Sequence, residues 1–510
     1  MIRRLLSVAG FTLLSRITGF VRDVLMAAIL GQGLLSDAFV VAFLFPNYFR
    51  AIFGEGTINP AFLPRYAALM AKGERAAAGL FADRVFAWQM AAQLLLLLVA
   101  LGAMPFLVML VAPGFAAHPE QLALTVELAR ISFPYLILTV VAVQLSAMLN
   151  AIEKFWAAAA WSNLLNLAMI GTLLSAPWFP SAAHAAAWGV LLGGLLQLLF
   201  ILWAGAREGL VLRFSWPRWT PEIREFFKAF GAVTLGAASV VVAPLIDTAL
   251  ASFLATGSRT ALYYADRINQ LPLGVLGIAL GTVLLPDMSA RLAKGDRSGS
   301  DFVQGRAAVL SLLSTLPFAA AFILIPAVIM RAIFAHGAFD RAAAELSAVA
   351  LAAYGVGLPA FALVRIMAST FYARHDTATP ARATITAIAV NIALKIVLVW
   401  GFGLGIAGIA LGTALGAWVN VGLLMWAGTS RSLLSVGPVL RRAIVPVLLA
   451  GVAAGAGAWA GAMGGGLAAA RVGHFNDEII LACAVLVSAV LYGGVIILFR
   501  RALPLGKAPA

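Results

Sequence analysis

The segment LPRYAALMAKGER, at residues 63–75, recurs as LPDMSARLAKGDR at residues 285–297, and the two align without a gap. Further along the chain, WGVLLGG (188–194) matches AGIALGT (407–413) at nearly the same offset. Separate segments that agree on nearly one offset indicate an internal repeat. Each half has room for six helices, and an even number of membrane crossings lets both halves enter the membrane from the same side. We therefore expect a parallel repeat about an axis along the membrane normal.

The composition identifies the environment of these halves. Of the 510 residues, 63% are hydrophobic and 11% are charged, and the mean hydropathy is +0.99. A soluble domain is about half apolar and a quarter charged, so the chain lacks the charges that soluble surfaces need. The single cysteine, Cys483, excludes an intramolecular disulfide, and the five histidines are too scattered to predict a metal site. The sequence predicts a polytopic membrane protein.

A membrane-spanning helix needs about 20 mostly apolar residues. Long uncharged runs, together with runs interrupted by isolated charges, predict fourteen such helices, at 6–30, 36–68, 85–112, 122–150, 156–177, 185–206, 229–255, 262–290, 307–334, 343–373, 383–401, 406–428, 443–466 and 478–499. The predicted fold is therefore an all-α polytopic membrane protein. Residues 1–228 are expected to form an N-lobe of six helices, residues 229–430 a C-lobe of six helices, and residues 431–510 two further helices outside the repeat.

The basic residues predict the orientation of the chain. With the N-terminus in the cytoplasm, 24 of the 35 lysines and arginines fall in cytoplasmic segments, and three, Arg259, Arg341 and Arg471, fall on the opposite side. The remaining eight lie inside helices. This bias fits the positive-inside rule with both termini cytoplasmic. The topology thus accounts for most of the net charge of +14, and nucleic-acid binding is not expected.

Charged residues inside the predicted helices are candidates for function, because each costs about 2.5–3.5 kcal/mol or more at mid-membrane. The first two helices contain Arg16, Arg22, Asp23, Asp37, Arg50 and Glu55, and later helices contain Asp247, Asp266, Arg267 and Lys395. On an ideal helix Arg16 and Asp23 share one face, and Arg22 points about 120° away.

Two interpretations of these charges remain open. The arginines are suited to an anionic substrate, above all a diphosphate, because a guanidinium binds phosphate through two parallel hydrogen bonds and does not deprotonate. Alternatively, they pair with Asp23, Asp37, Glu55 and Asp266 to hold helices together. Arg130, Arg331 and Arg365 fit a structural or interfacial role better than substrate binding.

Two longer motifs carry a family resemblance. The stretch SRITGFVRDVLMAAILGQGLLSDAFVVAFLFPNYFRAIFGEGTINPAFLP (15–64) resembles the lipid II flippase family MurJ/MviN, and YYADRINQLPLGVLGIALGTVLLP (263–286) resembles that family's eighth-helix segment. The resemblance implies the fold of the multidrug/oligosaccharidyl-lipid/polysaccharide exporter superfamily. It also implies that lipid II, an undecaprenyl-diphosphate-linked peptidoglycan precursor, is moved from the cytoplasmic to the periplasmic face of the bacterial inner membrane. Movement by alternating access needs no cofactor and no covalent chemistry.

The same resemblance assigns site residues by position. The expected substrate-binding residues are Arg16, Arg22, Arg50, Arg267, Asn47 and Ser15. The expected polar partners in the cavity are Asp23, Asp37, Glu55, Asp266 and Gln270, although some relatives have a glutamate at this last position.

Some members of the family bind sodium among helices 7, 11 and 12. Here Asp247, Asn391 and Thr413 are candidates for a remnant of that cation site, and Asn166 falls near Asn391 in the internal repeat. Lys395 lies one turn from Asn391, where an acidic ligand would be expected. Because an ammonium can take the place of a cation, the sequence predicts no sodium site.

The roughly 55-carbon tail of such a lipid would lose its hydrocarbon environment in a charged cavity. The two C-terminal helices are candidates for a groove that holds the tail, and ordinary lipid-facing packing is the alternative. Lipid II and membrane lipids are the expected partners of a monomer, with the peptidoglycan synthesis machinery as a further candidate.

Two other functions compete with this interpretation. A multidrug or polysaccharide exporter of the same superfamily is the first, although drug exporters generally favour cationic substrates and acidic cavities. A membrane glycosyltransferase is the second, but it would need a catalytic acid in a sizeable extracytoplasmic loop. The longest such stretches predicted here have about ten residues.

Overall fold

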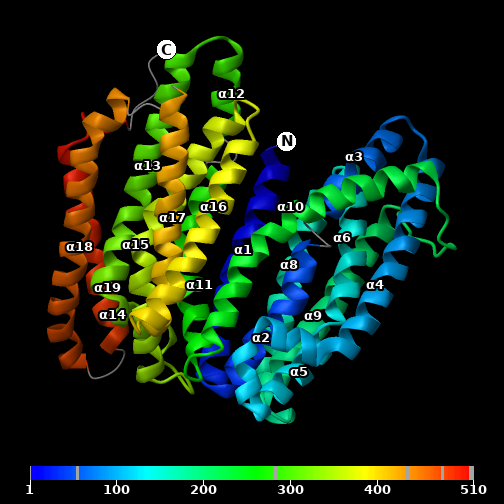
Figure 1. Cartoon of the computed structure of the whole chain (residues 1–510), viewed down its shortest axis with the longest axis horizontal. Helices are drawn as coiled ribbons and strands as arrows, with labels where there is room; N and C mark the ends of the chain where they lie inside the picture. The colour runs from blue at the N-terminus through cyan, green and yellow to red at the C-terminus, as the bar shows by residue number, and fades with distance from the viewer. Residues whose placement is uncertain are drawn as a thin grey trace. The chain divides into compact units, whose positions relative to one another are not determined.

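The computed structural model describes residues 2–52, 57–279, 284–431, 433, 437–472 and 476–504. Within these ranges every regular element is a helix (Figure 1), which confirms the predicted all-α class. The helices group into two compact units, each described here by itself. The first comprises residues 1–259 and 336–339, and the second comprises residues 260–335 and 340–510.

The described residues of the first unit form ten α-helices. They are α1 (Ile2–Leu30), α2 (Leu34–Arg50), α3 (Ile58–Ala71), α4 (Arg75–Val111), α5 (Pro119–Ser132), α6 (Tyr135–Ala151), α7 (Phe155–Ala160), α8 (Ser162–Leu174), α9 (Ala182–Arg207) and α10 (Pro221–Ala251). Short 3-10 turns follow α4 and α8, at Pro113–Ala117 and Ala176–Trp178. The helix α10 packs against α3 and α4. This packing groups residues 229–259 with the first six predicted spans, whereas the repeat assigns them to the second half.

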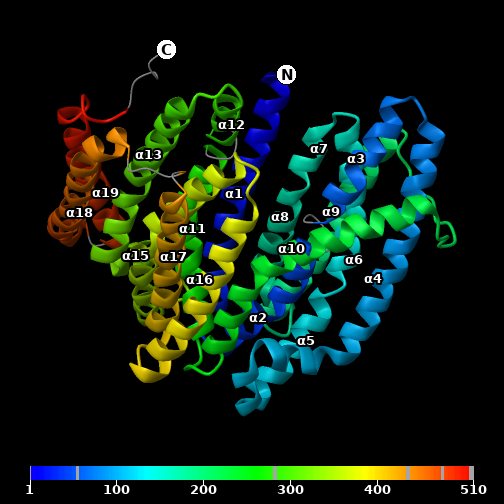
Figure 2. The same ribbon diagram turned by 45° about the horizontal axis from the view of Figure 1, so that its top comes forward.

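The second unit contains the remaining helices. They are α11 (Ser258–Ala279, whose first two residues belong to the first unit), α12 (Leu285–Ala293), α13 (Arg297–Leu324), α14 (Pro326–Phe334), α15 (Arg341–Tyr372), α16 (Ala378–Ile396), α17 (Gly405–Ser430), α18 (Pro438–Val472) and α19 (Asn476–Leu498). A π-helical turn, Val397–Gly401, extends α16. Both views show α18 and α19 side by side (Figures 1 and 2).

Each of the fourteen predicted spans coincides with one helix or with two consecutive helices. Ten of these segments, in the part of the chain that the structure describes, are long and apolar enough to cross a membrane. The other four are α1, α2 with α3, α10, and α11 with α12, and each of them carries charged residues within its apolar stretch. A multi-pass membrane protein is therefore confirmed, and the total of fourteen crossings stays a prediction.

The repeated sequence motif forms the same turn in both units. Lys72 ends α3 and Gly73 adopts a φ of +80° before α4, while Lys294 ends α12 and Gly295 adopts a φ of +78° before α13. Glycine is suited to this position because a Cβ atom disfavours positive φ. The two turns match in residue type and in backbone conformation, which supports the internal repeat.

Glycines also bring paired helices close together in both units. On α9, a Cβ added to Gly193 would lie 2.9 Å from the Cα of Leu165 on α8. On α17, a Cβ added to Gly412 would lie 3.3 Å from the Cα of Lys395 on α16. Small residues at such positions let membrane helices approach each other. The match between 188–194 and 407–413 thus reflects a shared helix-packing contact.

This contact gives the register of one pair of helices in the repeat. Because the two glycines occupy matching positions in the repeat, the residue opposite each of them shows how α8 corresponds to α16. Leu165 then corresponds to Lys395. In the same register Asn166 corresponds to Ile396, so Asn166 and Asn391 do not occupy equivalent positions. The two asparagines lie five positions apart in this register, because the connection between the paired helices is shorter in the second half.

Glycines also form the contact between the two C-terminal helices. Cβ atoms added to Gly457, Gly461 and Gly465 of α18 would lie 2.6, 2.7 and 2.9 Å from the Cα atoms of Ser488, Ala484 and Ile480 of α19, respectively. The order of these partners shows that the helices are antiparallel. In α19 Ala484 is buried at this contact, and the other residues are half-buried or exposed.

Candidate functional site

Arg22 lies at the centre of a buried polar cluster between α1 and α8. Its Nε and Nη2 atoms donate hydrogen bonds to Oδ1 of Asp23, at 3.1 and 2.7 Å, and its Nη1 donates to Oδ1 of Asn166 at 3.0 Å. The side chains of Arg22 and Asp23 are only 9% and 6% exposed. A buried charge is costly unless it is paired and hydrogen-bonded, and this pair meets both conditions.

Asn166 holds this cluster in place by bonding in two directions. While its Oδ1 accepts from Arg22, its Nδ2 donates to the backbone carbonyl of Ser15 and to Oγ1 of Thr18, both at 3.1 Å. A Cβ added to Gly19 would lie 3.4 Å from this amide, so a glycine leaves room for it. Partners on α1 therefore determine the orientation of the Asn166 amide. The amide in turn helps to direct the Arg22 guanidinium.

A second layer of the α1–α8 contact lies one turn away. Thr18 donates from Oγ1 to Oδ1 of Asn163 at 3.4 Å, and Ser162 donates to Oγ of Ser15 at 3.3 Å. Thr18, Ser162 and Asn163 were not expected as site residues from the sequence. The signal that could have found them is a row of polar residues, at 162, 163 and 166, on one face of an otherwise apolar helix.

The structure differs from the expected arrangement of the charges on α1. We predicted that Arg16 and Asp23 share a face and that Arg22 points away. Instead, Asp23 is bonded to its neighbour Arg22, whose long side chain bends back to reach the short carboxylate. Arg16 is exposed. For Arg22 the structural pairing considered from the sequence is therefore present, whereas Arg16 presents its charge outward.

On α2, the predicted residues Asn47 and Arg50 contact each other. Nη2 of Arg50 donates to Oδ1 of Asn47 at 3.0 Å, one helical turn away, and both side chains are half-buried. Glu55 lies outside the described residues. The helix ends at Arg50, and α3 begins at Ile58, so the predicted span 36–68 is two helices.

Asp37 has a structural contact that the sequence did not reveal. Its Oδ2 accepts a hydrogen bond of 2.6 Å from the backbone N–H of Gly257, and Asp37 is only 3% exposed. Gln32 donates from Nε2 to the carbonyl of the same glycine at 2.9 Å. Gly257 adopts a φ of +92° and immediately precedes α11. Asp37 thus fixes the turn before α11.

In the second unit, α11 places Asp266, Arg267 and Gln270 within little more than one turn. Arg267 donates from Nη2 to the hydroxyl of Tyr263 at 3.0 Å, and its guanidinium carbon lies 4.6 Å from the centre of that ring. Gln270 donates from Nε2 to Oδ2 of Asp266. Tyr263, quoted in the motif but not predicted as a site residue, therefore orients the predicted arginine through a cation–π contact.

The candidate cation-site residues are distributed over both units. Lys395 is 1% exposed and Asn391 is 9% exposed, and both lie on α16 against glycines of α17. Thr413 donates from Oγ1 to the carbonyl of Ile409 in its own helix at 3.2 Å. Asp247 is half-buried on α10 of the first unit. The described residues contain no group of three or more His, Cys, Asp or Glu side chains that could hold a metal ion.

Apolar helices long enough to span a membrane, with hydrogen-bonded arginines inside several helices, define this protein as a multi-pass membrane protein. Residues 26–464 match the family described as lipid II flippase MurJ. A probable lipid II flippase MurJ of Rhizobium tropici is 40% identical over 427 residues, which are 82% of this chain and 79% of the relative. The lipid II flippase MurJ of Burkholderia cenocepacia is 32% identical over 434 residues, or 84% and 83% of the two chains. The chain belongs to the lipid II flippase MurJ family.

Solved structures show the same fold. A lipid II flippase MurJ in an inward closed conformation superimposes with a TM-score of 0.77 at 23% identity, covering 97% of this chain and 99% of that one. An inward-facing multidrug resistance transporter of the MATE family in the MOP superfamily gives a TM-score of 0.67 at 16% identity, covering 82% and 94%. At these identities the likeness concerns the fold alone.

Proposed function

We propose that this protein translocates lipid II across the bacterial inner membrane, from the cytoplasmic to the periplasmic face. Membership of the flippase family supports the substrate class. The structural observation that carries the proposal is Arg22, a buried arginine in a helix of a multi-pass membrane protein, oriented by Asp23 and Asn166. Burying a charged side chain in a membrane helix costs free energy, so its presence there indicates a function.

The four arginines are proposed to bind the diphosphate of the substrate. Arg50 is directed by Asn47, and Arg267 is directed by Tyr263, so each guanidinium is held in one orientation before substrate arrives. Holding a donor in its bound orientation lowers the entropy cost of binding. Arg16 adds an exposed positive charge, and a guanidinium fork fits two phosphate oxygens at once.

The transport step is proposed to be alternating access, in which the headgroup is exposed first to the cytoplasm and then to the periplasm. It requires no bond to form or break, so we assign no catalytic residue. Both termini are placed in the cytoplasm, as the distribution of basic residues predicts. We further propose that the protein acts as a monomer and has the peptidoglycan synthesis machinery as a partner.

The lipid tail is proposed to lie against α18 and α19. These helices carry large apolar side chains that are mostly exposed, including Val452 at 69%, Val490 at 71% and Ile497 at 68%. A hydrocarbon tail on this surface would remain in an apolar environment while the headgroup moves. Residues 431–510 would then act as a separate part from the two repeated halves.

No sodium ion is included in the proposed mechanism. Lys395 is almost fully buried, and its ammonium carries the positive charge that a bound cation would otherwise supply. The hydroxyl of Thr413 already donates to a carbonyl of its own helix, and Asn391 packs against Gly416. We therefore treat these residues, with Asp247, as the remnant of a cation site.

The proposal is tested by reconstituting the purified chain in vesicles with fluorescent lipid II. The fraction of headgroups that a membrane-impermeant reagent can modify is then followed with time. We expect protein-dependent translocation that is lost in Arg16→Ala and kept in Arg218→Ala, which removes another exposed arginine of the first unit. Transport of cationic drugs without lipid II translocation would instead support a multidrug exporter.

A further inference from the structure

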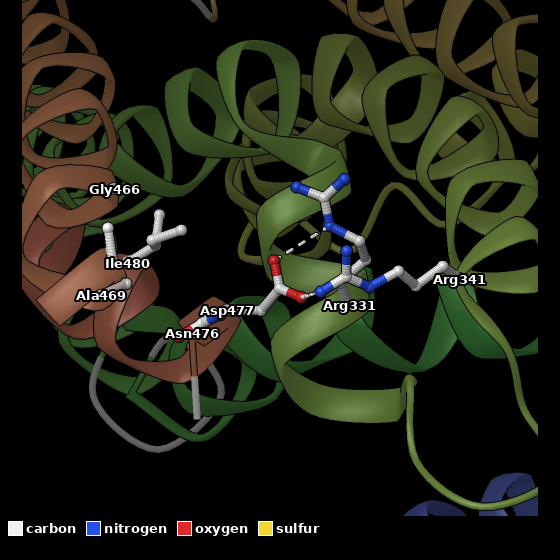
Figure 3. A pocket seen from close by; sticks show the side chains of 8 residues that line it. Arg331, Arg341, Gly466, Ala469, Asn476, Asp477 and Ile480 are labelled. Atoms are coloured by element: carbon white, nitrogen blue, oxygen red, sulfur yellow. Dashed lines mark hydrogen bonds and ion pairs between the residues drawn. The ribbon is translucent and has the colours of Figure 1, made fainter. Parts of the chain in front are cut away.

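A pocket with two arginines lies at one end of α14, α15, α18 and α19, away from the predicted substrate-binding residues. Its cavity volume is about 320 Å3, and its lining includes Arg331, Arg341, Asn476, Asp477, Gly466 and Ile480. All of these residues belong to the second unit. Figure 3 shows both guanidinium groups directed at the carboxylate of Asp477.

The ion pairs in this pocket hold the arginines in fixed positions. Arg331 donates from Nε to Oδ1 of Asp477 at 3.1 Å, and Arg341 donates from Nη2 to Oδ2 of Asp477 at 3.2 Å. Arg331 also donates to Glu345 at 3.3 Å. The side chain of Asp477 is only 14% exposed, whereas that of Arg341 is 71% exposed. Asp477 thus anchors Arg341 on one side and leaves its remaining N–H donors facing outward.

The charge and size of the pocket suit one phosphate group. Two guanidinium groups and one carboxylate line it, while Glu345, which also pairs with Arg331, is 61% exposed and lies outside the lining, so the wall itself has one more positive than negative group. A volume of about 320 Å3 lies at the lower end of the range for small-molecule sites, enough for a headgroup but not for an acyl chain as well. The orientation predicted from the basic residues places this end of the helices on the extracytoplasmic side, where few other basic residues are expected.

An apolar surface continues from the pocket along α18. Met463 and Leu467 are 62% and 75% exposed, and their spacing from Gly466 and Ala470 places all four along one helix face. A ligand with its phosphate on the arginines could therefore lay an acyl chain over these side chains. A free phosphate compound would use the arginines but gain nothing from this surface.

We propose that this pocket binds the phosphate of a membrane phospholipid in the extracytoplasmic leaflet, with an acyl chain along Met463 and Leu467. Arg341 and Arg331 supply the donors, Asp477 orients them, and Gly466 leaves the space. The bound phospholipid joins the α18–α19 pair to α14 and α15 at this end. The pocket does not include Val452, Val490 or Ile497, where the lipid II tail is proposed to lie, and its test contains no lipid II.

The first test compares two glycines of α18. A Cβ added to either Gly466 or Gly464 meets no atom within 4 Å, but only Gly466 lines the pocket. Native mass spectrometry of the purified full chain measures the affinity for dipalmitoyl phosphatidylglycerol. Gly466→Phe fills the pocket and should weaken the tightest site about tenfold, or about 1.4 kcal/mol, whereas Gly464→Phe should not. Equal affinities in the two variants would overturn the proposal.

The second test removes a charge without filling space. Arg341→Gln changes a largely exposed side chain, so the chain should fold normally even if Gly466→Phe does not. It should also weaken phosphatidylglycerol binding about tenfold, while binding of dipalmitoylglycerol, which has no phosphate, stays the same in all variants. The last comparison measures the binding of glycerol 3-phosphate, which has the phosphate but no acyl chain. If it binds as tightly as the lipid, the ligand is a free phosphate compound and the lipid assignment is wrong.

Discussion

Arg22 on α1 and Asn166 on α8 are joined by a hydrogen bond of 3.0 Å, from Nη1 of the arginine to Oδ1 of the asparagine. The same asparagine donates its amide to the backbone of Ser15, so its side chain cannot rotate without losing a bond. One neutral residue of α8 therefore helps to set the direction of a buried positive charge of α1. Asn166 is a positioning residue in this arrangement, and Arg22 is the group proposed to contact substrate.

We first predict that the translocation activity of Asn166 variants depends on whether the new side chain can accept a hydrogen bond. Asn166→Asp keeps an acceptor for Arg22, whereas Asn166→Leu leaves the buried guanidinium without this partner. Leaving a buried polar group unsatisfied costs about 1–3 kcal/mol. We expect the leucine variant to lose most lipid II translocation at normal membrane levels, and the aspartate variant to keep more. Similar activity in both variants would contradict the positioning role.

The second prediction concerns the geometry of the arginine itself. Arg22→Ala should abolish translocation while the protein still inserts in the membrane. Arg22→Lys should restore only part of it, because an ammonium keeps the charge but loses the planar pair of donors. Complementation of a flippase-depleted strain, with membrane levels measured in parallel, distinguishes the two. Full complementation by Arg22→Ala would argue against a diphosphate-binding role.

The third prediction tests the packing of the C-terminal helices. Gly461→Leu should force α18 away from α19, because even a Cβ atom would lie 2.7 Å from the Cα of Ala484. Overpacking of this kind costs about 1–3 kcal/mol. Gly464→Leu on the same helix is the matched control, since a Cβ there meets no atom within 4 Å. The unfolding temperature in detergent should fall for the first variant only, and an equal fall in both would exclude this contact.

The sequence predicted much of this arrangement, because long apolar runs locate helices and the repeat locates equivalent turns. It predicted Arg22 and its partner Asp23, but not Asn166, which also orients the arginine. The position of the Arg22 guanidinium depends on how its long side chain bends back to Asp23, and helical spacing alone does not contain that information. Asp37 illustrates the same limit, since its partner is a backbone N–H far away in the sequence, at Gly257.

The fourth prediction uses the two copies of the repeated turn. Asp296 precedes α13 and accepts a hydrogen bond of 2.8 Å from the N–H of Gly299, whereas its counterpart Glu74 makes no side-chain capping bond to α4. Asp296→Ala should therefore lower the unfolding temperature more than Glu74→Ala does. Equal effects of the two substitutions would show that the cap contributes nothing.

The same carboxylate should make stability depend on pH. The backbone N–H of Gly299, followed by the hydroxyl of Ser298, lowers the pKa of Asp296 in the folded protein. Its contribution to stability is therefore present above the unfolded pKa and is lost as pH falls through the lower folded pKa. Asp296→Asn keeps a capping oxygen without the charge, so the stability difference from the unmodified chain should shrink in acid. A difference that grows on acidification would reverse the sign and contradict this account.

The fifth prediction concerns Lys395. If its buried ammonium replaces a bound cation, translocation should proceed equally in sodium and in potassium. Lys395→Asp would replace the positive charge with a carboxylate near Asn391, which then requires a proton or a sodium ion. Translocation by this variant should therefore become dependent on sodium or on low pH. Strong sodium dependence of the unmodified protein would exclude the proposed role of the lysine.

The central claim is that the protein moves lipid II across a membrane by means of its oriented arginines. The most direct measurement is the rate at which fluorescent lipid II headgroups become accessible in vesicles that contain the purified unmodified chain, the Arg22→Ala variant or no protein. We predict rapid, protein-dependent exposure with the unmodified chain and a rate for Arg22→Ala that equals that of protein-free vesicles. Equal rates for the unmodified chain and Arg22→Ala, or no exposure with either, would contradict the account.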